Sequence, residues 1–173
     1  AGPDEVVARL RQVDEGGQAG VGDIFEWFVE NAVPGWYERR AAEAGLSVYQ
    51  ALERDAAQQR PGEAGLIALD WWNGNRSVLV NAGLSGLLID MTLGTRPPDI
   101  FRALIEATAF GTRIIVDTFE QNGVRVKELV ACGGLAERNK LLLQIYADVT
   151  GREFVVGGTG QAAGAGSTVV VSE

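Results

Sequence analysis

Apolar side chains recur every three or four residues along several stretches of the chain, which is the spacing of helices that bury one face. The stretch from Asp99 to about Gln121 is the longest of them, and Pro97 and Pro98 stand at its start, where a helix needs no N–H donor. Ser47 precedes another stretch and suits the N-cap position. The pattern predicts helices over residues 21–33, 37–44, 48–59, 99–121 and 140–150.

Shorter apolar runs lie between the predicted helices and are typical of buried strands. They cover residues 66–69, 78–80, 129–132 and 153–156, and we expect the last of them to be the final strand. Helices that alternate with short apolar strands indicate an α/β protein. In the tail, Gly158 to Ala163 fit a dinucleotide-binding pattern, but only ten residues follow Ala163. A Rossmann unit needs a helix, another strand and an acidic residue beyond that point, so we disfavour this interpretation.

The predicted helix over residues 99–121 carries two further local signals. Arg102 and Glu106 are four residues apart, so an ion pair along one face of the helix is expected. Ala107, Thr108 and Gly111 are small, so we expect another part of the fold to approach the helix closely there.

Composition and charge exclude several kinds of function. The 173 residues carry a net charge of −8 and no basic cluster longer than a pair, which argues against nucleic acid and membrane surfaces as partners. Histidine is absent, which excludes Ser-His and Cys-His triads and His-ligated zinc. The one cysteine, Cys132, lies in an apolar run and is expected to be a core residue. No signal peptide or membrane-spanning run is recognised, so we expect a soluble, cytoplasmic protein.

Two glycines, Gly133 and Gly134, follow the predicted strand at 129–132 and precede the next predicted helix. Glycines at a strand end let a flat or charged ligand approach the backbone, and α/β proteins usually bind ligands at such places. Asn139, at the helix start, could hydrogen-bond a ligand or serve only as an N-cap. The pattern is not that of a P-loop, and a tight turn without a ligand is the alternative.

A second candidate site is the block Asp-Trp-Trp-Asn-Gly-Asn-Arg-Ser at residues 70–77, which is rich in side chains that suit sugars. Indoles stack on the C–H faces of sugars, while carboxylates, amides and guanidinium groups bind hydroxyls. The alternative is a buried tryptophan pair beside a polar turn at Asn73 and Gly74. Asp70 and Glu15 are the carboxylates nearest to the candidate sites, although a lone carboxylate is usually solvated.

Three blocks together resemble the FGGY family of carbohydrate kinases, and among its members most closely those that act on L-ribulose. The blocks are EGGQAGVGDIFEWF at 15–28, LDWWNGNRSVLV at 69–80, and RALIEATAFG at 102–111, running on to Val-Thr-Gly at 149–151. The resemblance covers residues 15–156 and implies the C-terminal, nucleotide-binding domain of a ribonuclease-H-like, actin-type ATPase fold. This α/β fold is expected to be incomplete here. Residues 1–14 are unmatched, and residues 157–173 form a Gly- and Ala-rich tail.

The resemblance also implies ligand roles for particular residues. Asn139 and Gly134, with Gly133 beside it, match the family's adenosine-binding asparagine and glycine. Gly22 matches a glycine near the phosphates, and Glu26 falls where some relatives carry a nucleotide-contacting glutamine.

On the sugar side, Glu15 matches a glutamate that contacts sugar hydroxyls, and Asp70 opens the tryptophan block that marks the ribulose-phosphorylating members. The implied cofactors are ATP and Mg²⁺, and the implied substrate is L-ribulose or a related ketopentose. The family's catalytic aspartate and its Gly-Thr phosphate loop have no counterpart in this sequence. An N-terminal kinase domain is therefore an expected, missing partner, and the chain by itself is expected to be inactive. A homodimer, a non-catalytic nucleotide-binding or assembly module, and another sugar kinase of the family stay open as alternatives.

Overall fold

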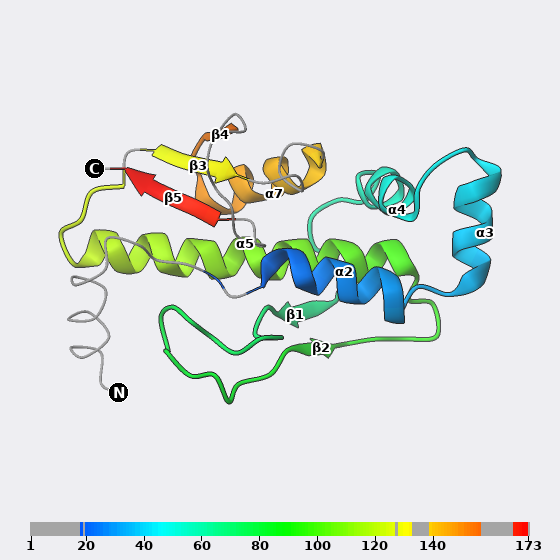
Figure 1. The fold of residues 1–173 in the computed structure, drawn as a ribbon, viewed down its shortest axis with the longest axis horizontal. Coiled ribbons are helices and arrows are strands. Elements are labelled where there is room, and N and C mark those ends of the chain that lie inside the picture. The colour runs from blue at the N-terminus through cyan, green and yellow to red at the C-terminus, as the bar shows by residue number, and fades with distance from the viewer. Residues whose placement is uncertain (1–17, 19, 127, 133–138, 157–167, 173) are drawn as a thin grey trace.

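The computed structural model describes residues 18, 20–126, 128–132, 139–156 and 168–172 (Figure 1). Five helices and five strands lie within these ranges. In chain order they are α2 (Val21–Asn31), α3 (Gly35–Glu43), α4 (Val48–Ala56), β1 (Ile67–Leu69), β2 (Leu87–Ile89), α5 (Pro97–Gln121), β3 (Glu128–Cys132), α7 (Lys140–Thr150), β4 (Phe154–Val156) and β5 (Thr168–Ser172). Each of the five predicted helices is confirmed.

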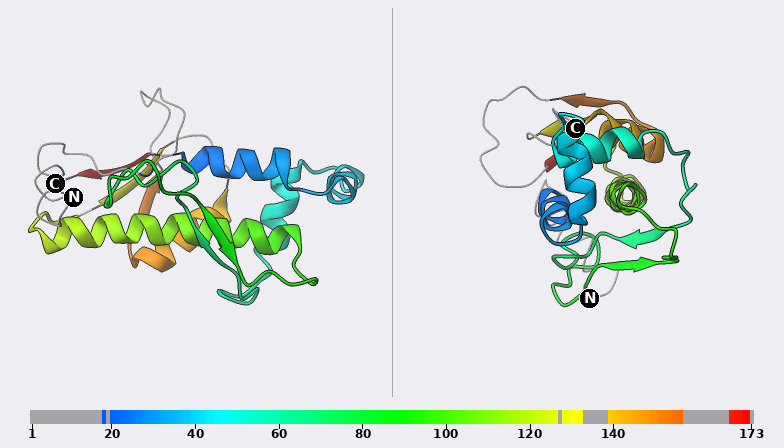
Figure 2. Two further views of the ribbon diagram at one scale, coloured as in Figure 1. Left: turned by 90° about the horizontal axis from the view of Figure 1, so that it is seen from below. Right: turned by 90° about the vertical axis from the view of Figure 1, so that its right-hand side faces the viewer.

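The long helix α5 runs through the middle of the molecule, and the other elements pack around it. Seen end-on, it has β1 and β2 on one side and α7 with the strands β3 and β4 on the other (Figure 2). Its buried side chains meet those of α2, where the ring of Phe101 lies edge-on to Phe25 at 5.6 Å and stacks with Phe28 at 6.4 Å. Leu142 and Ile145 of α7 belong to the same core.

The helix ends follow the local sequence closely. Ser47 is the N-cap of α4, as predicted: its Oγ accepts the Gln50 N–H at 3.2 Å, and Gln50 Oε1 accepts the Ser47 N–H at 2.9 Å. This helix ends at Ala56, three residues before the predicted end. Beyond that point the chain turns so that the Gln59 amide can donate to Asp99 Oδ1 of α5 at 2.6 Å. Arg102 of α5 also donates to the carbonyl oxygen of Ala56 at 3.1 Å, so contacts with α5 accompany the end of α4.

The strands form two small sheets. Strands β1 and β2 are antiparallel, with Ile67 opposite Ile89. In the second sheet the order is β4-β3-β5, with β3 parallel to β4 and antiparallel to β5. The strand at residues 153–156 is confirmed as β4, but it is not the final one. The valine-rich run at 168–172, which was not predicted, pairs with the second edge of β3.

The strand predicted at residues 78–80 is wrong. Backbone hydrogen bonds between Asn75 and Asn81, at 2.9 and 2.8 Å, close residues 76–80 into a loop. Within this loop Val80 has a φ of 50°, which is in the left-handed region rather than the extended one. A short apolar run becomes a strand only where a neighbouring strand can pair with it, and the asparagine pair removes that option here.

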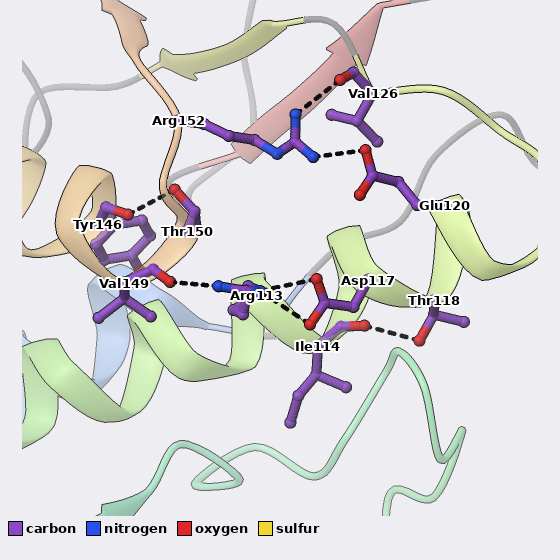
Figure 3. Close-up of polar contacts among 10 residues, drawn as sticks. All are labelled: Arg113, Ile114, Asp117, Thr118, Glu120, Val126, Tyr146, Val149, Thr150 and Arg152. Carbon is purple, nitrogen blue, oxygen red and sulfur yellow. Dashed lines mark hydrogen bonds and ion pairs between the residues drawn. The ribbon is translucent and has the colours of Figure 1, made fainter.

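Polar side chains fasten the second half of α5 to α7 and to the turn that follows it (Figure 3). The Arg113 guanidinium donates to both Asp117 oxygens, at 2.7 and 2.9 Å, and to the carbonyl oxygen of Val149 at 2.9 Å. Arg152 donates to the Val126 carbonyl oxygen at 3.0 Å and pairs with Glu120. These contacts hold α7 in a fixed place along α5. None of the helices in the described ranges is both long and apolar enough to cross a bilayer.

Candidate functional site

The side chain of Gln18 forms the centre of a polar cluster on α5. Its Nε2 donates to Asp70 Oδ2 at 2.7 Å and to the carbonyl oxygen of Thr108 at 2.7 Å. Its Oε1 accepts a hydrogen bond from the Thr112 hydroxyl at 2.8 Å. Gly111 makes this approach feasible, because a Cβ there would collide with Gln18 Nε2 and lie 2.5 Å from Asp70 Oδ2. The predicted close approach to the small residues of α5 is therefore confirmed, and its partners are a glutamine and a carboxylate.

Asp70 is a half-buried carboxylate held inside this cluster. Burial raises its pKa, and the hydrogen bond from Gln18 opposes that rise. The expectation that a lone carboxylate is solvated is therefore wrong for Asp70, because the end of β1 directs it toward α5. Tyr146 of α7 adds a buried hydroxyl beside Thr108 and Thr112, and burial raises its pKa as well. The cluster thus joins four separate parts of the chain.

The start of α2 lies immediately after Gln18 in the chain. Gly20 is the N-cap residue and has a φ of 68°, a left-handed conformation that glycine adopts without strain. Among the described residues, no atom lies within 4 Å of the position that a Cβ would take at Gly22. Glu26 is exposed and stands one turn later, so it shares a face of α2 with Gly22. At Gly22, this face is not covered by any of the residues that the structure describes.

A second cluster surrounds Asn139 at the start of α7. Asn139 is buried, 5% exposed, and its Oδ1 accepts the N–H of Leu142 at 2.8 Å. Glu53 of α4 binds two more backbone amides of α7. Its Oε1 accepts the N–H of Lys140 at 2.8 Å and that of Leu141 at 3.4 Å. The predicted N-cap role of Asn139 is confirmed. The first amides of α7 are thus already bound by carboxylate and amide oxygens, which leaves this helix start poorly suited to a phosphate.

Sequence reasoning missed both Gln18 and Glu53. Gln18 stands in a glycine-rich stretch and Glu53 within a predicted helix, and neither position carries a local signal of a site. Their partners stand 52 and 87 residues away, respectively, so no local spacing could reveal the contacts. The single useful signal was the run of small residues on α5, which indicated a close approach without naming what approaches.

The tryptophan block packs against α2. The rings of Trp72 and Trp27 lie 4.6 Å apart, and the Trp72 indole covers Gly86 so closely that a Cβ at that glycine would collide with the ring. Trp72 Nε1 is buried and has no hydrogen-bond partner among the described residues. For Trp72 the alternative of a packed tryptophan is therefore the one that the structure supports. Gly74 adopts the left-handed conformation, with a φ of 72°, in the predicted turn.

The predicted site residues that the structure describes lie in three places, and the rest lie outside the described residues. Asp70 belongs to the Gln18 cluster at the end of β1, Gly22 and Glu26 share one face of α2, and Asn139 belongs to the α4–α7 cluster. Glu15, Gly133 and Gly134 lie outside the described residues. Within the described ranges, no three His, Cys, Asp or Glu side chains gather closely enough to hold a metal ion.

Comparison with known proteins places this arrangement in a family. A model of the C-terminal domain of the FGGY family of carbohydrate kinases matches residues 7–171. A ribulokinase of Geobacillus thermodenitrificans is 57% identical over 155 residues, which are 90% of this chain and 28% of that protein. A ribulokinase of Mycolicibacterium smegmatis is 57% identical over 137 residues, 79% of this chain and 24% of that protein. The chain thus spans about a quarter of the length of these relatives.

Solved structures of the family have the same fold. Xylulose kinase from Rhodospirillum rubrum superposes with a TM-score of 0.58 and 26% identity, covering 73% of this chain and 25% of that one. Glycerol kinase of Plasmodium falciparum, solved with ADP, superposes with a TM-score of 0.61 and 21% identity, covering 82% of this chain and 26% of that one. The mixed helix and sheet arrangement is therefore part of an actin-type ATPase fold. The chain belongs to the FGGY family of carbohydrate kinases and corresponds to the C-terminal domain of its members.

Proposed function

We propose that the chain is the nucleotide-binding part of a kinase that transfers the γ-phosphoryl group of ATP to L-ribulose, giving L-ribulose 5-phosphate. The observation that carries this proposal is the 57% identity to a ribulokinase over 90% of the chain, a stretch that includes the tryptophan block. The ADP in the related glycerol kinase structure supports an adenine nucleotide as the cofactor.

We assign the nucleotide to two parts of the chain, the start of α7 and the start of α2. Asn139 with Gly133 and Gly134 would hold the adenosine, and Gly22 with Glu26 would face the phosphates. The geometry of the described residues is consistent with this division. The start of α7 is filled by Asn139 and Glu53 oxygens and suits a neutral group, whereas the open face of α2 at Gly22 leaves room for a bulky one.

The sugar is assigned to Glu15 and Asp70. Gln18 engages Oδ2 of Asp70, so Oδ1 is the oxygen that we assign to a substrate hydroxyl. Phosphoryl transfer depends on positioning and on neutralising the developing charge, to which Mg²⁺ contributes when it is bound with ATP. No residue of this chain is assigned to the metal. Because the catalytic aspartate and the phosphate loop of the family have no counterpart here, the chain alone would bind nucleotide without turning it over.

The test is a calorimetric titration of the purified chain with MgATP, followed by the same titration of Asn139→Asp. An aspartate still caps the Leu142 N–H, but it lacks the amide donor that adenosine would use. Loss of one hydrogen bond of about 1 kcal/mol predicts roughly five- to tenfold weaker binding. Ser47→Ala removes a cap from α4 and is the matched control, which should bind as the unmodified chain does.

Three outcomes would contradict the proposal. If the unmodified chain does not bind MgATP, a non-catalytic assembly module becomes the better interpretation. If Asn139→Asp binds MgATP equally well, adenosine does not contact the Asn139 side chain. ADP formation that depends on L-ribulose, measured in a coupled assay with the chain alone, would show that the catalytic residues are present here after all.

A further inference from the structure

We propose that Gln18 is a positioning residue that holds the nucleotide-facing start of α2 and the sugar-facing tryptophan block in one fixed relation. The proposal rests on the proposed function, because it concerns the same ligands. It does not assign any ligand contact to Gln18. Instead, its amide fixes the positions of the start of α2 and of the tryptophan block relative to α5.

The hydrogen bonds of Gln18 fix its orientation. A glutamine amide has two N–H donors and one carbonyl oxygen. Both N–H groups donate to oxygen acceptors, Asp70 Oδ2 and the Thr108 carbonyl oxygen. The Thr112 hydroxyl supplies the proton for the remaining oxygen. Exchanging the amide nitrogen and oxygen would set the amide oxygen against two acceptors, Asp70 Oδ2 and the Thr108 carbonyl oxygen. The Thr112 hydroxyl could adapt by accepting instead of donating, so the two acceptors favour the observed orientation.

Gln18 stands at the junction of the two segments. In the chain, Gln18 is followed two residues later by Gly20, the N-cap of α2, and then by Gly22. Its hydrogen-bond partner Asp70 directly precedes the two tryptophans, and Trp72 packs on Trp27 of α2. The Gln18–Asp70 bond and the Trp27–Trp72 contact therefore close a ring that joins α2 to the tryptophan block. Buried Val21, Ile24 and Phe25 pack α2 itself into the core, so loss of the Gln18–Asp70 bond would release the segment just before α2 from the tryptophan block and not the whole helix.

The chain contains a second Gln–Asp pair that serves as a matched control. Gln59 Nε2 donates to Asp99 Oδ1 at 2.6 Å, and Asp99 also belongs to α5. This pair stands about 15 Å along the helix from the Gln18 cluster, as the rise per residue gives. Both pairs join a glutamine amide to an aspartate carboxylate, although Gln18 makes two further hydrogen bonds and Gln59 Oε1 has no partner among the described residues. None of the predicted ligand residues lies beside Gln59 in the sequence. Replacing either glutamine should lower the stability of the chain. Only replacement of Gln18 should also weaken ligand binding.

The experiment compares Gln18→Ala with Gln59→Ala in the purified chain. Unfolding in urea gives the stability of each variant, and calorimetric titration with MgATP, at a temperature where each is folded, gives its affinity. We expect both variants to be less stable. Gln18→Ala should bind MgATP roughly tenfold more weakly, since small displacements of a ligand-facing segment have effects of that size. Gln59→Ala should bind within about twofold of the unmodified chain, which is within the variation expected of a distant, independent site.

An exchanged pair covers the case in which Gln18→Ala does not fold. Gln18→Glu alone places two carboxylates together, whereas Gln18→Glu with Asp70→Asn restores one donor and one acceptor between the two positions. The double variant should bind MgATP more tightly than Gln18→Glu alone.

The inference is overturned if Gln18→Ala binds as the unmodified chain does, if Gln59→Ala loses affinity to the same extent, or if the exchanged pair brings no recovery. Failure of the unmodified chain to bind MgATP is a different result, because it overturns the proposed function and this inference together.

Discussion

Replacing Gly111 by alanine tests the polar cluster on α5 directly, because opposing effects act at one position. In an exposed helix interior, alanine is more stable than glycine by about 1 kcal/mol. At position 111, however, the new methyl group would collide with Gln18 Nε2 and lie 2.5 Å from Asp70 Oδ2. Both side chains must then move away from the helix.

The cost of this movement can be worked out from the contacts. The two hydrogen bonds of Gln18 Nε2, each 2.7 Å long, would be lost or stretched, at about 1 kcal/mol each. Crowding of a packed site adds about 1–3 kcal/mol, since the Gly111 backbone is held within α5 and cannot withdraw. After subtracting the gain in helix propensity, we expect Gly111→Ala to lower the free energy of unfolding by about 2–4 kcal/mol.

Urea unfolding followed by circular dichroism measures this difference, with the slope of the transition as a check that the same surface is exposed. Gly22→Ala is the matched control, because it lies in α2 and no atom of the described part of the chain is within 4 Å of the added methyl group. It should leave the free energy of unfolding unchanged or raise it by up to about 1 kcal/mol. If Gly111→Ala is as stable as the unmodified chain, Gln18 and Asp70 do not pack against α5 as described.

Three further predictions concern other parts of the chain. Arg102→Ala should lower the free energy of unfolding by about 3 kcal/mol, because it leaves the Glu106 carboxylate, now 2.8 Å from Arg102 Nε, half-buried without its cation; a loss below about 1 kcal/mol in urea unfolding would contradict this. Asp70→Asn should equal or exceed the unmodified chain in stability at pH 7. The pKa of Asp70 is raised in the folded state, so the folded protein binds that proton more tightly, and the advantage of the asparagine should shrink as the pH falls through the raised pKa; a constant difference across the pH series would refute this. Ser47→Ala should cost about 1 kcal/mol and speed amide exchange at Gln50, whose N–H loses its acceptor; unchanged exchange there would show that the cap is not formed.

The helices were predictable because their signals are local. The Ser47 cap, the proline start of α5 and the Arg102–Glu106 pair each depend on residues within four positions of one another, and all three are present. The strands were less predictable. Residues 78–80 and 168–172 are both short and apolar, yet only the second run forms a strand, because β3 offers it a free edge.

The candidate site was predictable only in part, for the same reason. Asn139 was recognised by its place at a helix start, and the structure places it there as the N-cap, with its ligand role still a prediction. Glu53 was not recognised, because its importance comes from α4 packing beside the first turn of α7. Asp70 was chosen for its chemistry, but its burial and its partner could not be foreseen.

The sequence by itself determined the class of fold, the positions of the helices and the family resemblance, since periodicity, caps and motifs are written in consecutive residues. Only the tertiary structure decided what those residues do for one another. It joined Gln18 to Asp70 across 52 positions, set Glu53 against the amides of α7, and chose which apolar run became a strand. The physical reason is that hydrogen-bond partners, burial and strand edges are properties of segments brought together in space, and the folding of α5 into the centre of the molecule is what brings them together.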